Sequence, residues 1–402
     1  MEWTHAVAAL VFAATFLLLA LGRVGRRPVP RGLSALAGGV LTYLVLVPSG
    51  GMAWRVWRLI DWQVILLLAG LMVLAGLAEA AGLFAGVRRR LTHLAPGLAL
   101  WACLLLVAAT SALLLNDAAI VVLVPFLLPA LRAAGLPPVP SVVLMAVAAN
   151  AGSLLTPFGN PQNAALAAHA GLGVVDFLRA QGLIVLLAVA VLGLAAWKVG
   201  RLARPAATEV PAHAVARGRP WLALCIAVFL TGAAGGARFG LGTAAVLAAA
   251  LAYAGLRPLL GRDADRAAWR SLDWNVLALF LGLYLLPAGL AACFPSQNLP
   301  LARLDTAWKA ATATTLLSNT VGNVPAMLAF IGLDPAWAAA HASFLVTVST
   351  LGGALFLTGS AASLLAADQA RRQGVEVRFW PFLKEAVPWT LPLLGVGAWL
   401  TW

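Results

Sequence analysis

A series of apolar runs, many of them about 20 residues long, constrains the fold of this chain more than any other feature of its sequence. Each such run is long enough to cross a lipid bilayer as a helix. Of the 402 residues, 62% are hydrophobic and 10% are charged, whereas a soluble domain carries roughly a quarter charged residues. The sequence therefore predicts an all-α polytopic membrane protein that is surrounded by the lipid bilayer.

The apolar runs are of three kinds, which differ in length and in the polar residues within them. Two short pairs, at about 97–131 and 303–332, meet at polar residues and allow either a re-entrant hairpin or two full crossings each. Two further segments, at about 139–168 and 337–367, are interrupted by polar residues and predict discontinuous helices. Ordinary crossings are predicted at residues 6–22, 33–48, 62–86, 183–197, 221–236, 240–256, 273–293 and 386–402.

The two halves of the chain repeat the same features in the same order. Ile-Asp-Trp-Gln-Val at 60–64 is matched by Leu-Asp-Trp-Asn-Val at 272–276. Further matched pairs are Gly70 and Gly282, Asn116 and Asn319, Gly152 and Gly352, Gly159 and Gly359, and Asn163 and Ser363. The shared order predicts an internal duplication, with halves at 1–197 and 221–402 joined by a basic cytoplasmic linker at 198–220.

The positions of the 27 Lys and Arg residues test the topology. If the short pairs are hairpins and Arg23 is cytoplasmic, most of these residues lie on the cytoplasmic side, as the positive-inside rule requires. The same distribution argues against a nucleic-acid partner, although the net charge is +13. Each half then has five crossing helices and one hairpin, and this odd number of crossings inverts the second half. We therefore predict two inverted repeats in a multi-pass protein of the cell inner membrane.

The first hairpin carries Asn116 and Asp117 between its two apolar arms. A carboxylate at membrane depth costs roughly 2.5–3.5 kcal/mol on insertion scales, so such a residue is expected to have a function. Asp117 could coordinate a cation as a carboxylate, or carry a proton where burial favours its neutral form. The alternative is that Asp117 only caps the second arm of the hairpin.

The second hairpin carries short hydroxyl and amide side chains at the matching place, namely Ser318, Asn319 and Thr320. Such side chains beside free backbone carbonyls suit a dehydrated Na⁺. Helix N-termini at the same place suit an anion. The alternative is an ordinary polar loop with capping residues.

The two discontinuous segments supply the remaining candidates. Hydrogen-bonding side chains in the first break are Thr156, Asn160, Gln162 and Asn163. Gly159 beside them lets the backbone approach a ligand. The second break retains Thr358, Gly359 and Ser363 but has no proline, so the two half-sites are expected to be unequal. The alternative is a kink that serves packing alone, but this would not explain the neighbouring amides.

No enzymatic activity is predicted. The sequence has no Gly-rich phosphate loop, nucleophile elbow or zinc-ligand motif, which argues against an ATP-driven pump or a hydrolase. The three cysteines stand apart in apolar sequence and indicate neither a disulfide framework nor a metal site. We expect no cofactor, apart from Na⁺ as a candidate coupling ion.

Taken together, Asn116-Asp117, Ser318-Asn319-Thr320 and Thr-Pro-Phe-Gly-Asn-Pro-Gln-Asn at 156–163 resemble the ion transporter superfamily with a citrate-transporter-like domain. The resemblance covers nearly the whole chain. This group includes divalent-anion/sodium symporters, arsenite/antimonite permeases and one class of sodium/proton antiporters, and dimers are common in it, so a homodimer is one expected form. The resemblance implies cation and anion sites lined by Asn116, Gly159, Asn163, Ser318, Asn319 and Thr320, with Na⁺ at Asn116, Gly159 and Asn319.

The first hairpin departs from the Ser-Asn-Thr pattern of the dicarboxylate symporters, because it reads Leu115-Asn116-Asp117. This resembles the arsenite-permease and uncharacterised bacterial anion-permease branches more closely. The predicted function is secondary active transport of a small anion or oxyanion, coupled to Na⁺ or H⁺, by alternating access. No Lys or Arg is expected at membrane depth, which also permits arsenite/antimonite efflux or sodium/proton antiport. A channel is disfavoured, because a passive pore needs no duplicated central site.

Overall fold

The structure, a computed structural model, describes residues 2–21, 23–24, 27–46, 60–82, 89–91, 93–204, 219–234, 240–293 and 304–402. The predicted all-α membrane architecture is confirmed. Among the described residues, the helices long and apolar enough to cross a membrane are Trp62–Ala80, Pro96–Leu113, Asn116–Ala133, Val174–Gly200 and Gly242–Leu260. Most of the predicted linker (205–218) and residue 303 at the start of the second predicted hairpin lie outside the described residues.

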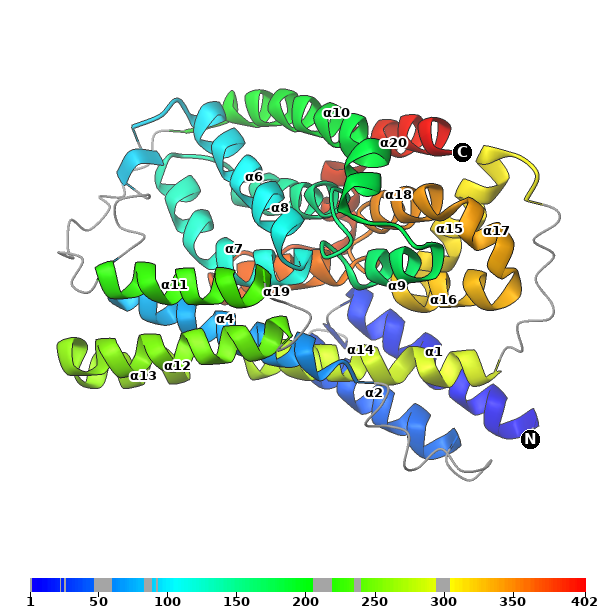
Figure 1. The fold of residues 1–402 in the computed structure, drawn as a ribbon, viewed down its shortest axis with the longest axis horizontal. Helices are drawn as coiled ribbons and strands as arrows, with labels where there is room; N and C mark the ends of the chain where they lie inside the picture. The colour runs from blue at the N-terminus through cyan, green and yellow to red at the C-terminus, as the bar shows by residue number, and fades with distance from the viewer. Residues whose placement is uncertain are drawn as a thin grey trace.

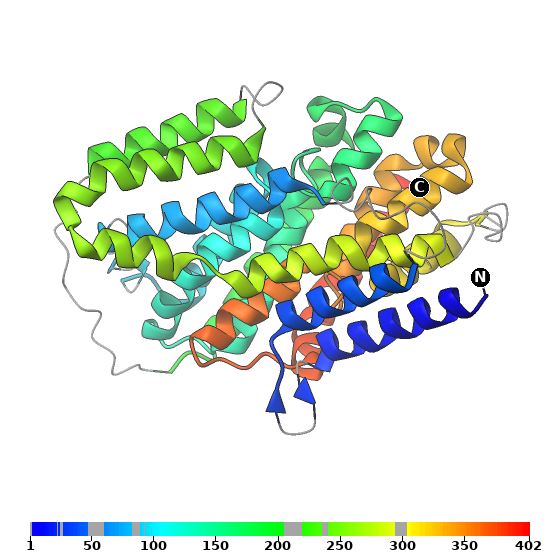
Figure 2. The ribbon, with the colours of Figure 1, turned by 90° about the horizontal axis from the view of Figure 1, so that it is seen from below.

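The helices pack in two layers, of which the lower one in Figure 1 is called the support layer. The support layer consists of α1 (Glu2–Leu21), α2 (Arg31–Leu46), α4 (Trp62–Ala80), α11 (Arg219–Ala234), α12 (Leu241–Leu260), α13 (Arg262–Ser271) and α14 (Trp274–Cys293). A short antiparallel pair, β1 (Arg23–Val24) and β2 (Arg27–Pro28), lies between α1 and α2 in the chain. Seen from below, α2 lies between α1 and α14 (Figure 2).

The upper layer in Figure 1 holds both hairpins and both discontinuous helices, and is called the hairpin layer. Its first-half helices are α6 (Pro96–Leu113), α7 (Asn116–Ala133), α8 (Pro138–Ser153), α9 (Pro161–Ala170) and α10 (Val174–Gly200). Its second-half helices are α15 (Ala307–Val321), α16 (Asn323–Leu333), α17 (Pro335–Ala340), α18 (Ala342–Gly353), α19 (Ala361–Arg372) and α20 (Phe379–Thr401). The helix pairs α6–α7 and α15–α16 are the hairpins, and α8–α9 and α18–α19 are the discontinuous helices.

The two halves of the chain are interleaved in the support layer. Helix α2 of the first half packs along α14 of the second half, and α4 of the first half packs along α12 of the second half. The matched Asp-Trp motifs begin α4 and α14. Asp61 Oδ1 accepts the N–H groups of residues 63 and 64 at 3.0 and 3.3 Å, and Asp273 Oδ1 accepts those of residues 275 and 276 at 3.0 and 3.1 Å. Each aspartate thus caps its own helix.

The amide that follows in each motif caps the neighbouring helix from the other half. Gln63 Oε1 accepts the N–H of Gly242 at the start of α12 (3.0 Å). Asn275 Oδ1 accepts the N–H of Gly32 at the start of α2 (3.0 Å). The two copies of the motif therefore make equivalent contacts, which explains why an amide stands at this position in both.

A glycine lies at the close approach of each of these helix pairs. A Cβ added at Gly70 of α4 would lie 2.6 Å from the carbonyl carbon of Ala245 and 2.7 Å from the nitrogen of Val246, both on α12. A Cβ added at Gly282 of α14 would overlap the backbone of Ala35 on α2. The absent side chain allows backbone-to-backbone packing, the usual role of small residues between membrane helices.

We expect Gly70→Leu to lower the stability of the support layer. The added side chain has no space against α12, and overpacking of this kind costs typically 1–3 kcal/mol. Thermal unfolding of the purified protein in detergent should show a lower midpoint for Gly70→Leu. Gly182→Leu on α10 is the matched control, because nothing lies within 4 Å of a Cβ at Gly182. Equal midpoints for the two variants would contradict the packing role of Gly70.

The structure differs from the sequence-based prediction at the second hairpin. The turn lies at Gly322, which adopts a φ of 93°, and Ser318, Asn319 and Thr320 belong to the last turn of α15. A positive φ favours glycine, so Gly322 was the signal in the sequence for the end of this helix. Helix α13 and the β1–β2 pair were not predicted. Helix α13 is short and charged, with Asp263 and Asp265 in its first turn, where acidic residues stabilise a helix.

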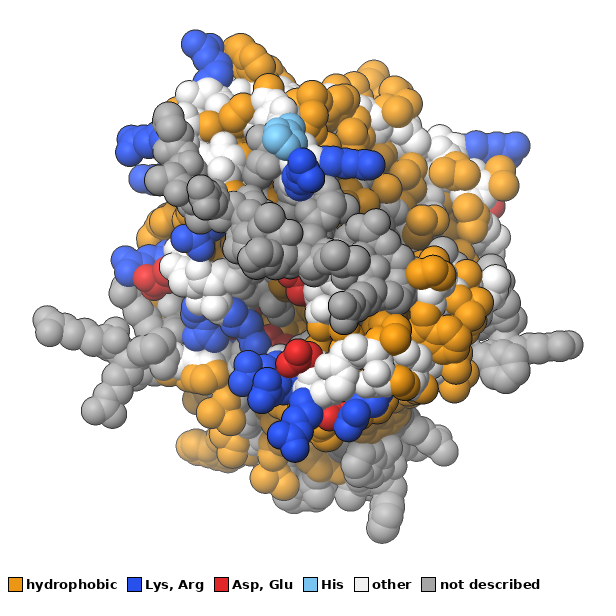
Figure 3. All heavy atoms as spheres, turned by 90° about the vertical axis from the view of Figure 1, so that its left-hand side faces the viewer, with side chains coloured by type: hydrophobic (Ala, Val, Ile, Leu, Met, Phe, Trp, Pro, Cys, Tyr) orange, Lys and Arg blue, Asp and Glu red, His pale blue; other side chains and the backbone are white. Residues whose placement is uncertain are grey.

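One end of the molecule carries many basic side chains. Figure 3 views the end that lies at the left of Figure 1, and shows more Lys and Arg than acidic side chains among the described residues. Helix α13 lies at this end. An excess of basic side chains at this end agrees with a cytoplasmic face under the positive-inside rule.

Candidate functional site

Four helices begin inside the hairpin layer, where the hairpins meet the breaks. They are α7 at Asn116, α9 at Pro161, α16 at Asn323 and α19 at Ala361. The first turn of each helix has backbone N–H groups without intrahelical partners and a partial positive charge. Pro161 favours a new helix at this point, because proline fits the first helical position but not the interior. Polar helix ends are thus brought together within otherwise apolar sequence.

The tip of the first hairpin is hydrogen-bonded to the first discontinuous helix through Asn116. Its backbone N–H donates to the Gly159 carbonyl (2.9 Å), and its side-chain amide donates to Asn150 Oδ1 (3.2 Å). Asn116 Oδ1 accepts the N–H of Asp117 at 2.9 Å. The side chain of Asn116 therefore holds the hairpin in place against the break.

Asp117 is the only acidic residue in the hairpin tips and breaks. Its side chain is 5% exposed, and Oδ1 has no hydrogen-bond partner among the described residues. The N-cap of α7 is Leu115, with no side-chain cap, so Asp117 does not act as the capping residue considered above. An acceptor oxygen buried without a partner is costly, and a cation or a proton would satisfy it.

The first break leaves a second acceptor oxygen without a partner. Asn163 Nδ2 donates to the carbonyls of Ser153 (2.9 Å) and Thr156 (3.1 Å). These two bonds fix the orientation of the amide, and Asn163 Oδ1 has no partner within the described part of the chain. Thr156 Oγ1 donates to the Ala112 carbonyl (2.6 Å), and Asn160 Nδ2 donates to Ser153 Oγ. Thr156 and Asn160 thus shape the break, and Asn163 presents the acceptor.

Asn319 makes the same arrangement in the second half. Its Nδ2 donates to the carbonyls of Thr315 (2.8 Å) and Gly352 (3.1 Å). Asn319 Oδ1 and Asn323 Oδ1 both lack a hydrogen-bond partner among the described residues. In both halves, therefore, an amide nitrogen is tied to two carbonyls, and its oxygen is presented without a donor.

Two glycines keep the space around these oxygens open. A Cβ added at Gly359 would overlap Asn319 Oδ1 and lie 2.5 Å from the Gly353 carbonyl oxygen. A Cβ added at Gly353 would lie 2.8 Å from the Gly359 carbonyl oxygen and 3.1 Å from Asn323 Oδ1. Amide and carbonyl oxygens from the second hairpin and the second break therefore surround one small space that only glycine leaves free.

The remaining predicted site residues differ in burial and in hydrogen bonding. Ser318 and Ser363 are fully buried, and the hydroxyl of each lacks a partner in the described structure. Thr358 is half-buried in the turn between α18 and α19. Thr320 is exposed and donates to the Leu316 carbonyl of its own helix at 2.7 Å. The two serines therefore add two buried hydroxyls without a partner, and Thr320 lies on the exposed face of α15.

Two reciprocal contacts join the half-sites. Asn150, on α8 before the first break, accepts a hydrogen bond on Oδ1 from Ser360 Oγ of the second break (3.1 Å). Thr350, on α18 before the second break, accepts on Oγ1 from Gln162 Nε2 of the first break (3.3 Å). The predicted site residues did not include Asn150, Thr350 or Ser360, whereas Gln162 was predicted as a hydrogen-bonding side chain of the first break. The available signal was a polar residue two positions before Gly152 and Gly352 in both halves.

The composition of the site determines which ligands it suits. The unpartnered atoms named above are carboxylate, amide and hydroxyl oxygens, and no Lys or Arg occurs in residues 111–118, 150–163, 314–325 or 347–363. Hard cations are bound by oxygen ligands, and Na⁺ sites in transporters use unwound carbonyls near helix breaks. The residues present fit Na⁺, which Asn319, Asn323 and the Gly353 and Gly359 carbonyls would hold in the second half. In the first half, Asp117 and Asn163 each present a buried acceptor oxygen.

Comparison with known proteins assigns the chain to a family. The sequence model of the citrate transporter family (CitMHS) matches residues 16–352. The chain belongs to this family. The chain is also similar to the silicon efflux transporter LSI3 of Oryza sativa subsp. japonica, which is 26% identical over 96% of both chains. An uncharacterized transporter of Mycobacterium tuberculosis (strain H37Rv) is 26% identical over 98% of this chain and 97% of its own. The inner membrane protein YbiR of Escherichia coli (strain K12) is 27% identical over 87% of this chain and 90% of its own. The protein is thus a membrane transporter of the citrate transporter family, and its family and relatives are transporters rather than enzymes.

Proposed function

We propose that this protein is a secondary active transporter of a small oxyanion across the inner membrane, coupled to Na⁺ or H⁺. The observation that carries the proposal is the set of buried acceptor oxygens at two hairpin–break junctions that contact each other. These oxygens suit a cation, and the four helix N-termini suit the negative charge of an anion. With no Lys or Arg in the same segments, the anion binds favourably only together with a cation. Obligatory joint binding is the physical basis of coupled transport.

Alternating access is proposed from the arrangement of the two halves. Each half contributes a hairpin and then a discontinuous helix, and the two discontinuous helices make reciprocal contacts through Asn150 and Thr350. We propose that the halves are inverted relative to each other in the membrane, with the basic end seen in Figure 3 in the cytoplasm. The hairpin layer would then move relative to the support layer and expose the site to each side in turn.

A second candidate is favoured by Asp117. A buried carboxylate without a basic partner disfavours an anion in the first half-site and is compatible with a neutral hydroxylated acid, such as arsenous acid. One full-length relative is named a silicon efflux transporter, and a relative covering 38% of this chain is named a putative transporter arsB. Efflux of such an acid in exchange for a proton, or sodium/proton exchange without another substrate, is the alternative.

Uptake into proteoliposomes separates these functions. The purified protein is tested with citrate, succinate, sulfate, arsenite and silicic acid, each with an imposed Na⁺ gradient, an imposed pH gradient or neither. The expected result is concentrative uptake of a charged oxyanion that requires one of the gradients. Transport of arsenite or silicic acid alone would select the second candidate. Flux that follows the substrate gradient alone and exceeds transporter turnover would indicate a channel and contradict both.

A further inference from the structure

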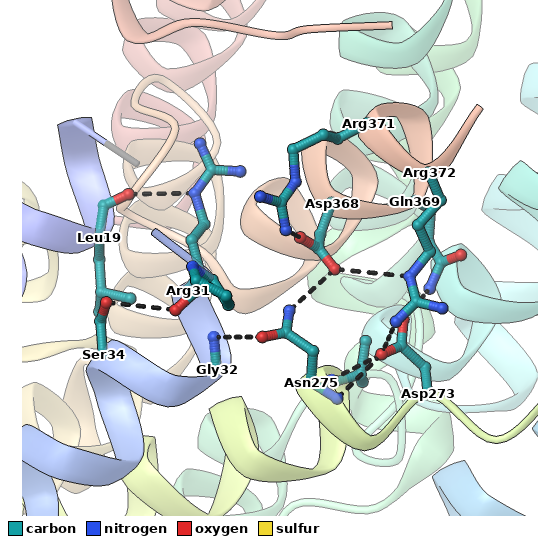
Figure 4. Close-up of polar contacts among 12 residues, drawn as sticks. Leu19, Arg31, Gly32, Ser34, Asp273, Asn275, Asp368, Gln369, Arg371 and Arg372 are labelled. Atoms are coloured by element: carbon teal, nitrogen blue, oxygen red, sulfur yellow. Dashed lines mark hydrogen bonds and ion pairs between the residues drawn. The ribbon is translucent and has the colours of Figure 1, made fainter. Parts of the chain in front are cut away.

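Charged and amide side chains link the end of α19, in the hairpin layer, to the starts of α2 and α14, in the support layer (Figure 4). Arg372 forms an ion pair with Asp273, whose Oδ2 also accepts Gln369 Nε2 at 3.2 Å. Asn275 Nδ2 donates to Asp368 Oδ2 at 3.1 Å. These five residues are called the interlayer network. All of these contacts cross from one layer to the other.

The network is firmly held on both sides. In the support layer, Asp273 caps α14 and Asn275 Oδ1 accepts the N–H of Gly32, so both side chains are fixed by backbone groups. In the hairpin layer, Arg371 holds Asp368 at 2.7 Å. The side chains of Asp273 and Asp368 are each 2% exposed. Separating such carboxylates from their partners without letting in water leaves buried unpaired charges, which is strongly unfavourable.

Among the described residues of the first half, the matching positions form no counterpart of this network. By the correspondence of Gly159 with Gly359, the positions that match Asp368, Gln369 and Arg372 are Ala168, His169 and Leu172. His169 Nε2 lies 2.9 Å from the Pro335 carbonyl oxygen, which belongs to the hairpin layer itself.

Gln63, the amide that matches Asn275, has no hydrogen bond to the hairpin layer among the described residues. Gln63 makes its hydrogen bonds to Gly242 and Thr243 within the support layer. The polar link between layers is therefore built at the α19 end of one half and has no equivalent at the α9 end of the other.

We propose that the interlayer network is a lock that holds the transporter in one of its two alternating states and is released in the other. Helix α19 packs on α7 and α8 of its own layer, so it moves with that layer. Hydrogen bonds of about 3 Å do not survive a displacement of a few ångströms, so any sliding of the layers breaks the network. Because only one half can form it, the lock favours one state over the other. The proposal rests on the alternating access proposed above.

The test measures from which side a cysteine in the site is reached. Thr358→Cys is introduced into a chain in which Cys103, Cys225 and Cys293 are replaced by alanine, and a membrane-impermeant maleimide is applied to either side of oriented vesicles. Arg372→Gln and Asp273→Asn each remove one side of the ion pair, and asparagine retains the cap of α14. Each variant should change the ratio of labelling from the two sides by about tenfold in the same direction, the effect of losing one charge-assisted hydrogen bond.

The double variant and a surface control complete the test. Arg372→Gln combined with Asp273→Asn should shift the ratio no further than either single variant, because both remove the same contact. Arg378→Gln removes an exposed ion pair with Glu376 (2.8 Å) that does not cross between layers, and should leave the ratio unchanged. Unchanged ratios in the single variants, additive shifts in the double variant, or an equal shift in Arg378→Gln would each overturn the lock.

Failure of the lock and failure of alternating access give different results. If the parent Thr358→Cys chain is labelled from both sides and the network variants leave the ratio unchanged, the lock is wrong and alternating access stands. If the parent chain is labelled from one side under all conditions, alternating access fails, and the lock falls with it. Hydrogen exchange at the end of α19 should also be faster in Arg372→Gln than in Arg378→Gln if the network ties the layers together.

Discussion

Asp117→Asn is expected to abolish uptake driven by a pH gradient while leaving the protein folded. Asparagine has the size of aspartate but no titratable proton, and the Asp117 carboxylate is buried with an oxygen that has no partner among the described residues. If Na⁺ is the coupling ion instead, the loss of the negative charge should weaken the apparent Na⁺ affinity by about 10–100-fold. Initial rates of uptake into proteoliposomes, measured against pH and against Na⁺ concentration, distinguish the two results.

Asp305→Asn is the control for this substitution. Asp305 is exposed and paired with Lys309 at 2.6 Å, outside the hairpin tips and breaks, so its loss should change neither coupling nor affinity. Wild-type dependence on both gradients in a folded Asp117→Asn variant would remove Asp117 from the mechanism. The functional role inferred for the first hairpin would then have to be given up.

Gly359→Ala should lower the apparent affinity for the coupling ion and the substrate by about tenfold or more, the cost of overpacking by one methyl group in a filled space. The new Cβ would overlap Asn319 Oδ1 and approach the Gly353 carbonyl oxygen at 2.5 Å. Asn319→Ala should have the same effect for the opposite reason, since it removes the oxygen without adding a clash. Concentration dependence of uptake measures both.

Gly332→Ala is the matched control for Gly359→Ala. Gly332 lies on α16 of the second hairpin, is exposed, and has nothing within 4 Å of the added Cβ. Alanine is favoured over glycine inside a helix, so this variant should be as stable as the parent or more so. Wild-type affinity in both Gly359→Ala and Asn319→Ala would show that the second hairpin is structural and binds no ligand.

Much of the architecture could be read from the sequence because membrane helices and helix breaks have local causes. The apolar runs set the helices, Pro161 and Gly322 set two of the ends, and the Asp-Trp motifs contain their own capping residues. The predicted ends of the first hairpin, at about 97 and 131, lie within two residues of α6 and α7 as they stand in the structure. Each of these features depends on residues close together in the chain.

The features that could not be predicted depend on contacts between distant residues. The bond from Gly32 to Asn275 spans 243 residues, and that from Ser360 to Asn150 spans 210. An amide or hydroxyl in an apolar helix shows that a partner is needed but not which one. The same limit applies to Asp273 and Asp368, whose pairing with Arg372 and Asn275 follows from how the layers pack.

The most direct test of the transport mechanism is the labelling of Thr358→Cys with and without ligand. In a chain whose three native cysteines are replaced by alanine, an impermeant maleimide should reach the cysteine at position 358 from either side of the membrane. Saturating substrate with the coupling ion should slow labelling from both sides. Labelling from one side only, at a rate that no substrate and neither ion changes, would show that the two breaks do not form a site with alternating access.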